Sequence, residues 1–200
     1  MKPIAIALTG ASGMPYTLAL IRQLIRTEDV IYIMISQAAS TVISMETDLR
    51  LGSGSAEIEQ NLCDYFGAKD GQFQVFSKNQ WTAPVASGSN PPRAMVVCPC
   101  TMSTLAAIAH GHAYNLMHRA ADVVIKEGKK LILVPRETPY SAIHLENMLK
   151  LARLGVSIID ANPAFYQKPE SIDDLVNFVI ARILDHLDVE HQLLPPWQAD

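Results

Sequence analysis

The amino-acid sequence predicts an α/β protein built on a parallel β-sheet with helices on both of its faces. Short apolar segments rich in β-branched residues alternate along the chain with longer segments whose apolar residues recur at helical spacing. Continuous apolar segments of this kind are typical of strands buried on both sides, and strands separated by helices pair in parallel.

The predicted elements alternate along the whole chain. Strands are expected over residues 3–8, 30–35, 73–76, 94–97, 131–134 and 156–159. Helices are expected over residues 14–26, 37–45, 55–66, 102–109, 115–127, 141–154 and 172–187. Residues 77–93 are rich in proline and serine, which predicts a long loop of functional interest. No linker divides the chain, so residues 1–200 are expected to form a single domain with a C-terminal tail from about residue 188.

The composition excludes several functional classes. Charged residues make up only 18% of the chain, against roughly 25% in an average soluble domain, which suggests a surface hidden in a homo-oligomer. The net charge of -4 opposes bulk attraction to nucleic acid or anionic membranes. No apolar segment reaches the roughly 20 residues of a membrane span. Three cysteines and the lack of a secretory leader favour the cytoplasm.

Residues able to do chemistry follow the predicted strands. Residues 10–13, Ser36, residues 98–104 and the pair Arg136-Glu137 each come directly after a strand. Because the carboxyl ends of parallel strands share one edge of the sheet, these residues are expected to converge on one rim, where ligands bind in such folds.

The turn Thr9-Gly10-Ala11-Ser12-Gly13 opens the first helix. It lacks the lysine of a P-loop and the third glycine of a dinucleotide-binding fingerprint. Gly10 could take a positive φ or let a ligand approach the backbone, and Ser12 places a hydroxyl where helix N–H groups favour anions. Capping of the helix by Ser12 is an equally good interpretation.

Two further predicted helix starts carry hydroxyl groups. Ser36 follows the second strand, and Thr101, Ser103 and Thr104 follow the fourth. Each alone is more simply a helix cap. Together, three hydroxyl-bearing junctions on one rim indicate a shelf that binds a phosphate and a polar ring.

The candidate cations and metal ligands are few. Arg119 and Lys126 lie seven residues apart on one predicted helix, so they face the same side. Cations of this kind suit phosphate oxygens, although a single surface cation is more often only solvated. The His110/His112 and Cys98/Cys100 pairs do not have zinc-ligand spacing, so no metal site is expected.

Eight short motifs occur in order along the chain. They are TGASG…Y (9–16), METD (45–48), ASGS (86–89), CPC (98–100), RAADVVIKE (119–127), VPRETP (134–139), AFY (164–166) and IARIL (180–184). Together they resemble the flavin prenyltransferases, the UbiX/Pad1-type proteins formerly called 3-octaprenyl-4-hydroxybenzoate carboxy-lyases. The resemblance covers residues 3 to about 187.

This resemblance implies a three-layer Rossmann-like or flavodoxin-like sandwich and a homododecamer. It implies metal-independent transfer of a dimethylallyl group from dimethylallyl monophosphate to N5 and C6 of reduced FMN. The product, prenylated FMN, would be handed to a UbiD-type decarboxylase, with ubiquinone biosynthesis as the default pathway.

The resemblance also implies roles for individual residues. The expected FMN contacts are Gly10, Ala11, Ser12, Ser36, Thr101, Met102, Ser103, Thr104 and Arg136. The expected contacts of dimethylallyl phosphate are Ser89, Arg119, Lys126, Tyr166 and Arg182. The expected catalytic residues are the carboxylates Glu46 and Glu137, with Ser12 beside them, Lys126, and Trp81 in the prenyl pocket.

Two alternative functions stay open. An FMN-dependent cysteine-type decarboxylase would carry a catalytic histidine near the opening helix, but no histidine precedes His110. A non-catalytic flavin carrier would need no cations beyond those on the FMN phosphate, so replacing Lys126 would leave its behaviour unchanged.

Overall fold

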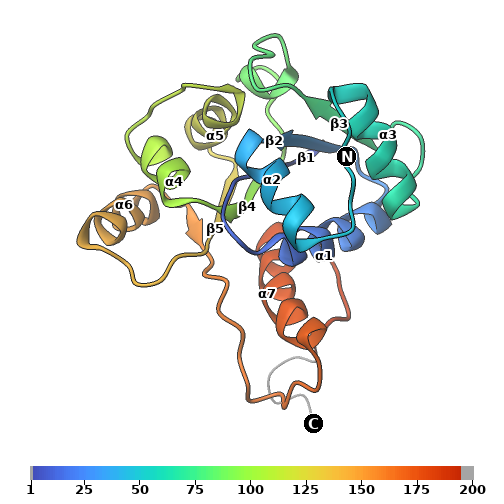
Figure 1. The fold of residues 1–200 in the computed structure, drawn as a ribbon. Coiled ribbons are helices and arrows are strands. Elements are labelled where there is room, and N and C mark those ends of the chain that lie inside the picture. The colour runs from blue at the N-terminus through green and yellow to red at the C-terminus, as the bar shows by residue number, and fades with distance from the viewer. Residues whose placement is uncertain (1, 195–200) are drawn as a thin grey trace.

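A six-stranded parallel sheet lies between two layers of helices in the computed structural model, which describes residues 2–194 (Figure 1). The strands are β1 (Ile4–Leu8), β2 (Ile31–Ile35), β3 (Phe73–Phe76), β4 (Ala94–Cys100), β5 (Lys130–Pro135) and β6 (Ser157–Ile158). Their order across the sheet is β3-β2-β1-β4-β5-β6, and each neighbouring pair is parallel. The predicted α/β class, a three-layer sandwich around a parallel sheet, is confirmed.

Alternate strand residues enter two separate cores, because successive side chains of a strand point to opposite faces. In β1, Ile4 and Ile6 pack against α1 (Met14–Leu24), α2 (Gln37–Glu46), α3 (Ser55–Phe66) and α7 (Ile172–Leu187). Ala5 and Ala7 enter the other core, against α4 (Met102–Ala109), α5 (Leu116–Lys126) and α6 (Ala142–Arg153). The sheet therefore stands between α7 and α5.

The helix ends follow local signals that the sequence contains. Ser171 begins α7 with a capping box, in which its hydroxyl accepts from the Asp174 N–H while the Asp174 carboxylate accepts from the Ser171 N–H. Gly67 ends α3 in the left-handed region, with φ 63°. The first predicted helix is shorter than expected, because α1 ends at Leu24 and a 3-10 turn covers Ile25–Thr27.

Strand β4 is longer than the sequence predicted. The prediction ended it at Val97, before Pro99. In the structure the strand shifts register after Val97, and Cys100 still pairs with Pro135 of β5. Pro99 has no N–H to donate, but its carbonyl accepts a hydrogen bond from the Thr9 N–H. The central strand thus reaches the rim beside the first turn.

The strand order reverses between β1 and β4, the two central strands. Chain segments leave these strands toward opposite sides of the sheet, to α1 and to α4. Ligands of open α/β sheets bind at such a switch point. The first turn after β1 and the turn after β4 both lie there.

The C-terminal tail predicted from about residue 188 begins with a residue that packs into the domain. Val189 is buried and joins the core on the α1 and α7 side of the sheet. Residues 195–200, the last six of the predicted tail, lie outside the described residues. Within residues 2–194 there is no helix with the length and apolar character needed to cross a membrane.

Candidate functional site

The turns after β1, β2 and β4 are joined at the carboxyl edge of the sheet. The Ser36 N–H donates to the Leu8 carbonyl at 3.0 Å. The buried Thr9 hydroxyl donates to the Pro99 carbonyl at 2.7 Å and accepts from the Thr101 N–H at 2.8 Å. The predicted convergence on one rim is confirmed for these turns. Thr9 holds the turns after β1 and β4 together. It was not identified as a site residue from the sequence, because a threonine before a glycine carries no distinct signal.

Glu46 caps the N-terminus of α1. Its Oε2 atom accepts hydrogen bonds from the backbone N–H groups of Gly13 and Met14, both at 2.9 Å. Gly13 is the N-cap residue, has φ 126° and provides no side chain. The interpretation of Ser12 as the cap is therefore wrong, since a carboxylate from the end of α2 satisfies these groups.

The charge on Glu46 is stabilised by its surroundings. Partial burial acts to raise the pKa of this carboxyl, but hydrogen bonds from the Ser12 side chain and from the Gly13 and Met14 N–H groups, together with the charge of Arg136, lower it below its ordinary value. Glu46 is therefore ionised at neutral pH. The anion at the first glycine turn is thus a carboxylate of the chain itself.

Gly10 is needed for packing rather than for an unusual backbone angle. Its φ lies outside the left-handed region, and a Cβ added at this position would lie 2.4 Å from the Cβ of Ala38 at the start of α2. The positive φ considered for Gly10 is thus wrong, and the close approach is to α2. Ala11, which follows, is buried.

The hydroxyl groups of Ser36 and Thr101 cap helices, as the simpler interpretation held. Ser36 Oγ accepts from the Ala39 N–H at 3.1 Å, and Thr101 Oγ1 accepts from the Thr104 N–H at 3.3 Å. Thr101 also lies 3.1 Å from Ser103 Oγ and 3.0 Å from Thr104 Oγ1. Each capping oxygen accepts from one backbone N–H group, and a helix begins with four N–H groups that lack a partner within the helix. The N-termini of α2 and α4 therefore still present N–H donors to the rim. Met102 is buried in the core and its side chain packs there.

Arg136 and Glu137 leave β5 toward the same rim. Arg136 is exposed, and its Nε donates to the Ser12 carbonyl at 3.3 Å. Glu137 is half-buried, and its Oε1 accepts from the N–H of Thr138 at 3.2 Å. The structure thus gathers Ser12, Glu46 and Arg136, which lie far apart in the sequence.

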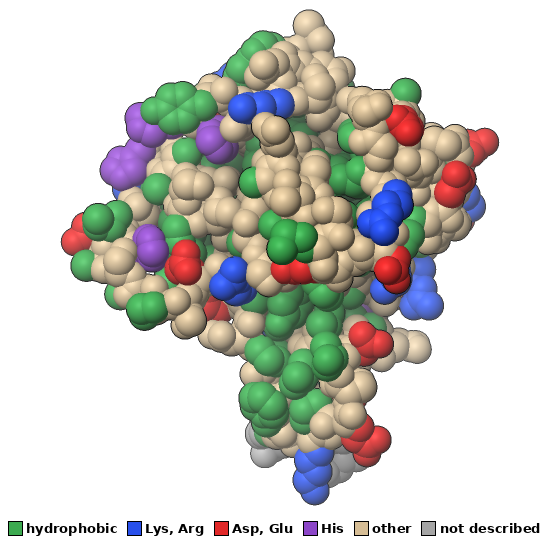
Figure 2. All heavy atoms as spheres, viewed as in Figure 1, with side chains coloured by type: hydrophobic (Ala, Val, Ile, Leu, Met, Phe, Trp, Pro, Cys, Tyr) green, Lys and Arg blue, Asp and Glu red, His purple; other side chains and the backbone are tan. Residues whose placement is uncertain are grey.

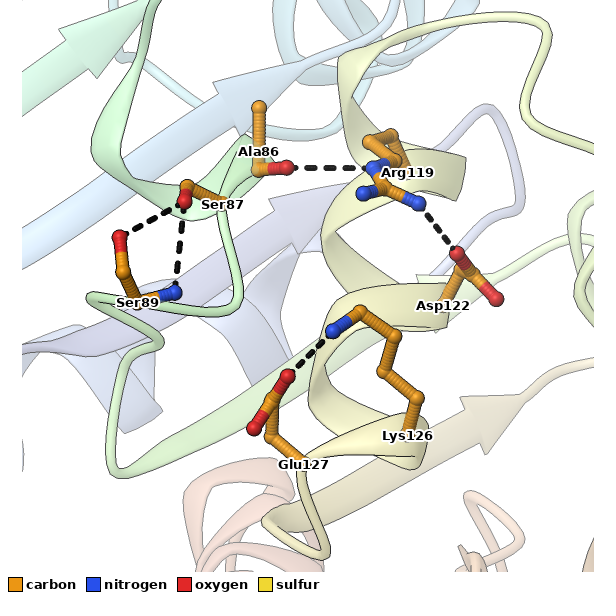
Figure 3. A network of polar contacts seen from close by, with 7 residues as sticks. All are labelled: Ala86, Ser87, Ser89, Arg119, Asp122, Lys126 and Glu127. Atoms are coloured by element: carbon orange, nitrogen blue, oxygen red, sulfur yellow. Dashed lines mark hydrogen bonds and ion pairs between the residues drawn. The ribbon is translucent and has the colours of Figure 1, made fainter.

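Arg119, Lys126 and Ser89 form a second group, on the α5 side of the sheet (Figure 3). Arg119 Nε donates to the Ala86 carbonyl at 3.1 Å. A Cβ added at Gly88 would lie 2.5 Å from Lys126 Nζ, so both cations face the segment 86–89. The prediction that they share one side of a helix is confirmed.

Each cation of this group holds a carboxylate partner. Arg119 Nη1 lies 2.7 Å from Asp122 Oδ2, and Lys126 pairs with Glu127 (Figure 3). Ser89 Oγ lies 2.8 Å from the hydroxyl of Ser87. Asp122 and Glu127 were not identified from the sequence. The spacing of Asp122, three residues after Arg119, was an available signal for an ion pair on a helix, but Glu127, one residue after Lys126, had none.

Tyr166 and Arg182 lie on the opposite side of the sheet. Both line a cavity of about 1220 Å³ that also contains Phe178. The Tyr166 ring packs edge-on against Phe178 at 5.9 Å between centroids, and Arg182 Nη1 lies 2.7 Å from Asp185 Oδ2 on α7. The five residues expected around one phosphate are therefore two groups, and the sheet separates them.

The other candidates are placed as follows. Trp81 is 49% exposed, in the segment between β3 and the 3-10 turn Pro84–Ala86. Burial raises the pKa of the Cys98 thiol to about 12 and also raises that of Cys100, so neither is a nucleophile at neutral pH. Across residues 2–194, no three His, Cys, Asp or Glu side chains gather as a metal-ligand set.

Comparison with known proteins places the chain in a family. The model of the Flavoprotein family matches residues 1–184. The flavin prenyltransferase UbiX of Pseudomonas aeruginosa is 50% identical over 194 residues, which are 97% of this chain and 93% of that protein. The chain belongs to the flavin prenyltransferase family. UbiX of Methanocaldococcus jannaschii, at 40% identity over 97% of each chain, extends the likeness to an archaeal member of this family.

Solved structures of flavin prenyltransferase relatives share the fold. The structure of AnUbiX (PadA1) in complex with FMN and dimethylallyl pyrophosphate superimposes with a TM-score of 0.86 at 36% identity, covering 99% of this chain and 98% of that one. A dodecameric FMN-dependent Ubix-like decarboxylase from Escherichia coli O157:H7 gives a TM-score of 0.85 at 39% identity, covering 98% and 100%.

Proposed function

We propose that the protein transfers a dimethylallyl group from dimethylallyl monophosphate to N5 and C6 of reduced FMN. The observation that carries this proposal is the meeting of Ser12, Glu46 and Arg136 at the switch point of the sheet. It occurs in a chain that is 50% identical to a flavin prenyltransferase. A related structure contains both FMN and a dimethylallyl diphosphate, which matches the two substrates in chemical class.

The rim residues fit FMN by the kind of donors they provide. The N-termini of α2 and α4 present N–H groups and hydroxyls beside the exposed guanidinium of Arg136. Such donors suit a phosphate and the polar edge of a flavin ring. Reduced FMN supplies the nucleophilic nitrogen and carbon. The chain binds and orients it through Ser36, residues 101–104 and Arg136.

The cations stabilise the leaving group. Breaking the allylic C–O bond leaves a phosphate dianion and an allylic cation, and Arg119, Lys126 and Arg182 supply positive charge for the phosphate. No metal ion is required for this step. Each charge-assisted hydrogen bond contributes roughly 1.5–3 kcal/mol. The aromatic face of Trp81 stabilises the allylic cation.

The two glutamates have different roles. The second bond to the ring requires loss of the proton from C6, and a positioned carboxylate accepts it. Glu46 already accepts two backbone hydrogen bonds and is held in the ionised state, so it orients Ser12 and Arg136. Within residues 2–194, Glu137 accepts a single hydrogen bond, from the Thr138 N–H, and is the freer proton acceptor.

A homo-oligomer would unite the two groups of phosphate ligands. Since the sheet separates α5 from α7 within one chain, Tyr166 and Arg182 of one copy would face Arg119 and Lys126 of another. Hydrophobic side chains cover the lower projection that α7 and the preceding segment form (Figure 2). Phe165 and Ile172 are the most exposed of these, at 70% and 77%. By likeness to the dodecameric Escherichia coli protein, the assembly is a dodecamer.

The product and its use complete the proposal. We propose that prenylated FMN leaves this protein to serve a UbiD-type decarboxylase, and that both proteins are cytoplasmic. Ubiquinone biosynthesis is the pathway we propose.

The test is anaerobic. The protein is mixed with reduced FMN and dimethylallyl monophosphate, and the mass of the released flavin is measured, with a reaction that lacks the donor as control. A gain of one C5H8 unit is the expected result. Unchanged FMN from a sample that binds it would contradict the proposal and favour a non-catalytic flavin carrier.

A further inference from the structure

The turn between β5 and α6 carries two site residues and is anchored at both ends. At its start, Arg136 donates to the Ser12 carbonyl at 3.3 Å. At its end, the hydroxyl of Tyr140 donates to Oδ1 of Asp160, which follows β6. Glu137 lies between the two anchors.

The backbone alone holds this part of the sheet weakly. Strands β5 and β6 pair at only two register positions, the last being Leu133 with Ile158. The Ile159 N–H still donates to Leu133 at 2.9 Å, but the next bond, from Ala161 N–H to the Pro135 carbonyl, is 3.4 Å long. The link from Tyr140 to Asp160 therefore continues the connection beyond the end of the strand ladder.

Both partners of this link are themselves fixed. The second carboxylate oxygen of Asp160 accepts from Asn162 Nδ2 at 3.0 Å. The Tyr140 ring packs edge-on against His144, with 6.5 Å between centroids. His144 belongs to the capping box of Ser141 at the start of α6. The phenol thus connects the turn between β5 and α6 to the end of β6 and to the first turn of α6.

Tyr140 remains a hydrogen-bond donor at physiological pH. Burial raises the pKa of its phenol, and the hydrogen bond and negative charge of Asp160, with the charge of Glu137, raise it further.

We propose that Tyr140 and Asp160 are positioning residues that hold Arg136 and Glu137 in their places on the rim. The inference rests on the proposed prenyl transfer. A side chain that is misplaced by a fraction of an ångström in such a site loses rate, while ligand binding by other groups is kept. The two residues act through the turn and do not touch the substrates.

The test compares Tyr140→Phe, Asp160→Ala and Asp160→Asn with the wild type, and Tyr114→Phe is the matched control. Tyr114 is exposed and its ring stacks on His112, which phenylalanine preserves. Both Tyr140→Phe and Asp160→Ala remove the hydrogen bond between these two residues, and each is expected to lower kcat about tenfold. The KM for reduced FMN should change less than about twofold, because most of its contacts lie on other turns. Asp160→Asn, whose amide oxygen still accepts from Tyr140, should recover most of the rate.

A second readout is independent of turnover. Hydrogen–deuterium exchange of residues 136–141 should be faster in Tyr140→Phe and Asp160→Ala, while exchange of the central strands and the melting temperature stay near the wild type. If the wild type makes no prenylated flavin, the proposed function fails and this exchange experiment alone decides the inference. A kcat equal to that of the wild type, or unchanged exchange of residues 136–141, in Tyr140→Phe would overturn the positioning role of Tyr140 and Asp160. If that variant does not fold, Asp160→Ala and Asp160→Asn decide by the same criteria.

Discussion

Glu46 occupies the position at the start of α1 that a bound anion takes in many strand–helix turns. Two backbone N–H groups, a hydroxyl and a nearby guanidinium stabilise its charge. A carboxylate in this place links α2 to α1 and sets the orientation of Ser12. One side chain therefore contributes both to stability and to the geometry of the site.

The variant Glu46→Gln tests the stabilising role. Because the folded state lowers the pKa of Glu46 below its ordinary 4.5, the ionised group adds stability above that pH, and the contribution is lost as pH falls through the lowered pKa. Loss of a helix cap costs about 1 kcal/mol. We expect Glu46→Gln to lower the free energy of unfolding by this amount at pH 7, as measured by urea denaturation.

The same experiment under acid conditions is the control. Below the lowered pKa both proteins carry a neutral group at position 46, so the difference in unfolding free energy should shrink. A difference that stays constant from pH 7 to acid would show that the charge of Glu46 is not its source.

Lys126 is the residue that separates an enzyme from a carrier. Its ammonium group faces Gly88 on the second group of the site and is paired with Glu127. A phosphate that arrives there competes with this carboxylate for the ammonium group. In the proposed reaction, removing the cation takes away one charge-assisted contact to the leaving group.

We expect Lys126→Ala to lower turnover about 10- to 100-fold while FMN still binds. Rates are measured from the mass of released flavin, and FMN binding by fluorescence of the oxidised form. Lys150→Ala, on an exposed position of α6, is the matched control. Full turnover in Lys126→Ala would exclude a role in leaving-group stabilisation.

At the scale of elements, the first turn and α2 are packed with no space for a methyl group. A Cβ at Gly10 would lie 2.4 Å from the Ala38 Cβ, well inside van der Waals contact. The rim needs this approach, because α2 carries both Ser36 at its start and Glu46 at its end. The glycine thus sets how two elements meet.

We expect Gly10→Ala to destabilise the protein by about 1–3 kcal/mol through overpacking. The double variant Gly10→Ala/Ala38→Gly removes the clash, although glycine in a helix itself costs about 1 kcal/mol. A double-mutant cycle from urea denaturation should therefore give a favourable coupling energy of about 1 kcal/mol or more. Strict additivity of the two changes would mean that Gly10 serves another purpose.

At the scale of the whole molecule, the phosphate site that we propose requires more than one chain. Arg119 and Lys126 lie on α5, and Arg182 lies on α7, with the sheet between the two helices. One phosphate cannot contact both groups within a monomer. The low charge content and the hydrophobic lower projection agree with an assembly that brings them together.

Mixing of inactive variants tests this arrangement. Lys126→Ala and Arg182→Ala should each be poorly active alone. Co-assembled with separate tags, they should regain activity, because some sites then combine an intact Lys126 with an intact Arg182 from different copies. Turnover of mixed and separate assemblies is compared at equal flavin content, with mass measured by light scattering. A mixture no more active than the average of its parts would place each site within one chain.

The sequence by itself determined the class of fold and most element boundaries. Apolar strands and amphipathic helices alternate, and polar side chains cap the helices, so residues 55–66, 102–109 and 172–187 were predicted as the structure has them. Local hydrogen bonding and hydrophobic periodicity act over a few residues, and a sequence shows them directly. The motifs also identified the family, because their order along the chain is itself sequence information.

Tertiary structure alone decided how the site is assembled. The capping of α1 by Glu46, the tie that Thr9 makes between two turns and the bond from Tyr140 to Asp160 join residues 20 to 92 positions apart. No local pattern encodes such contacts, since they depend on the order of the strands. The separation of Arg182 from Lys126 is also decided by the tertiary structure. Successive strand residues point to opposite faces of the sheet, and α7 covers one face while α5 covers the other.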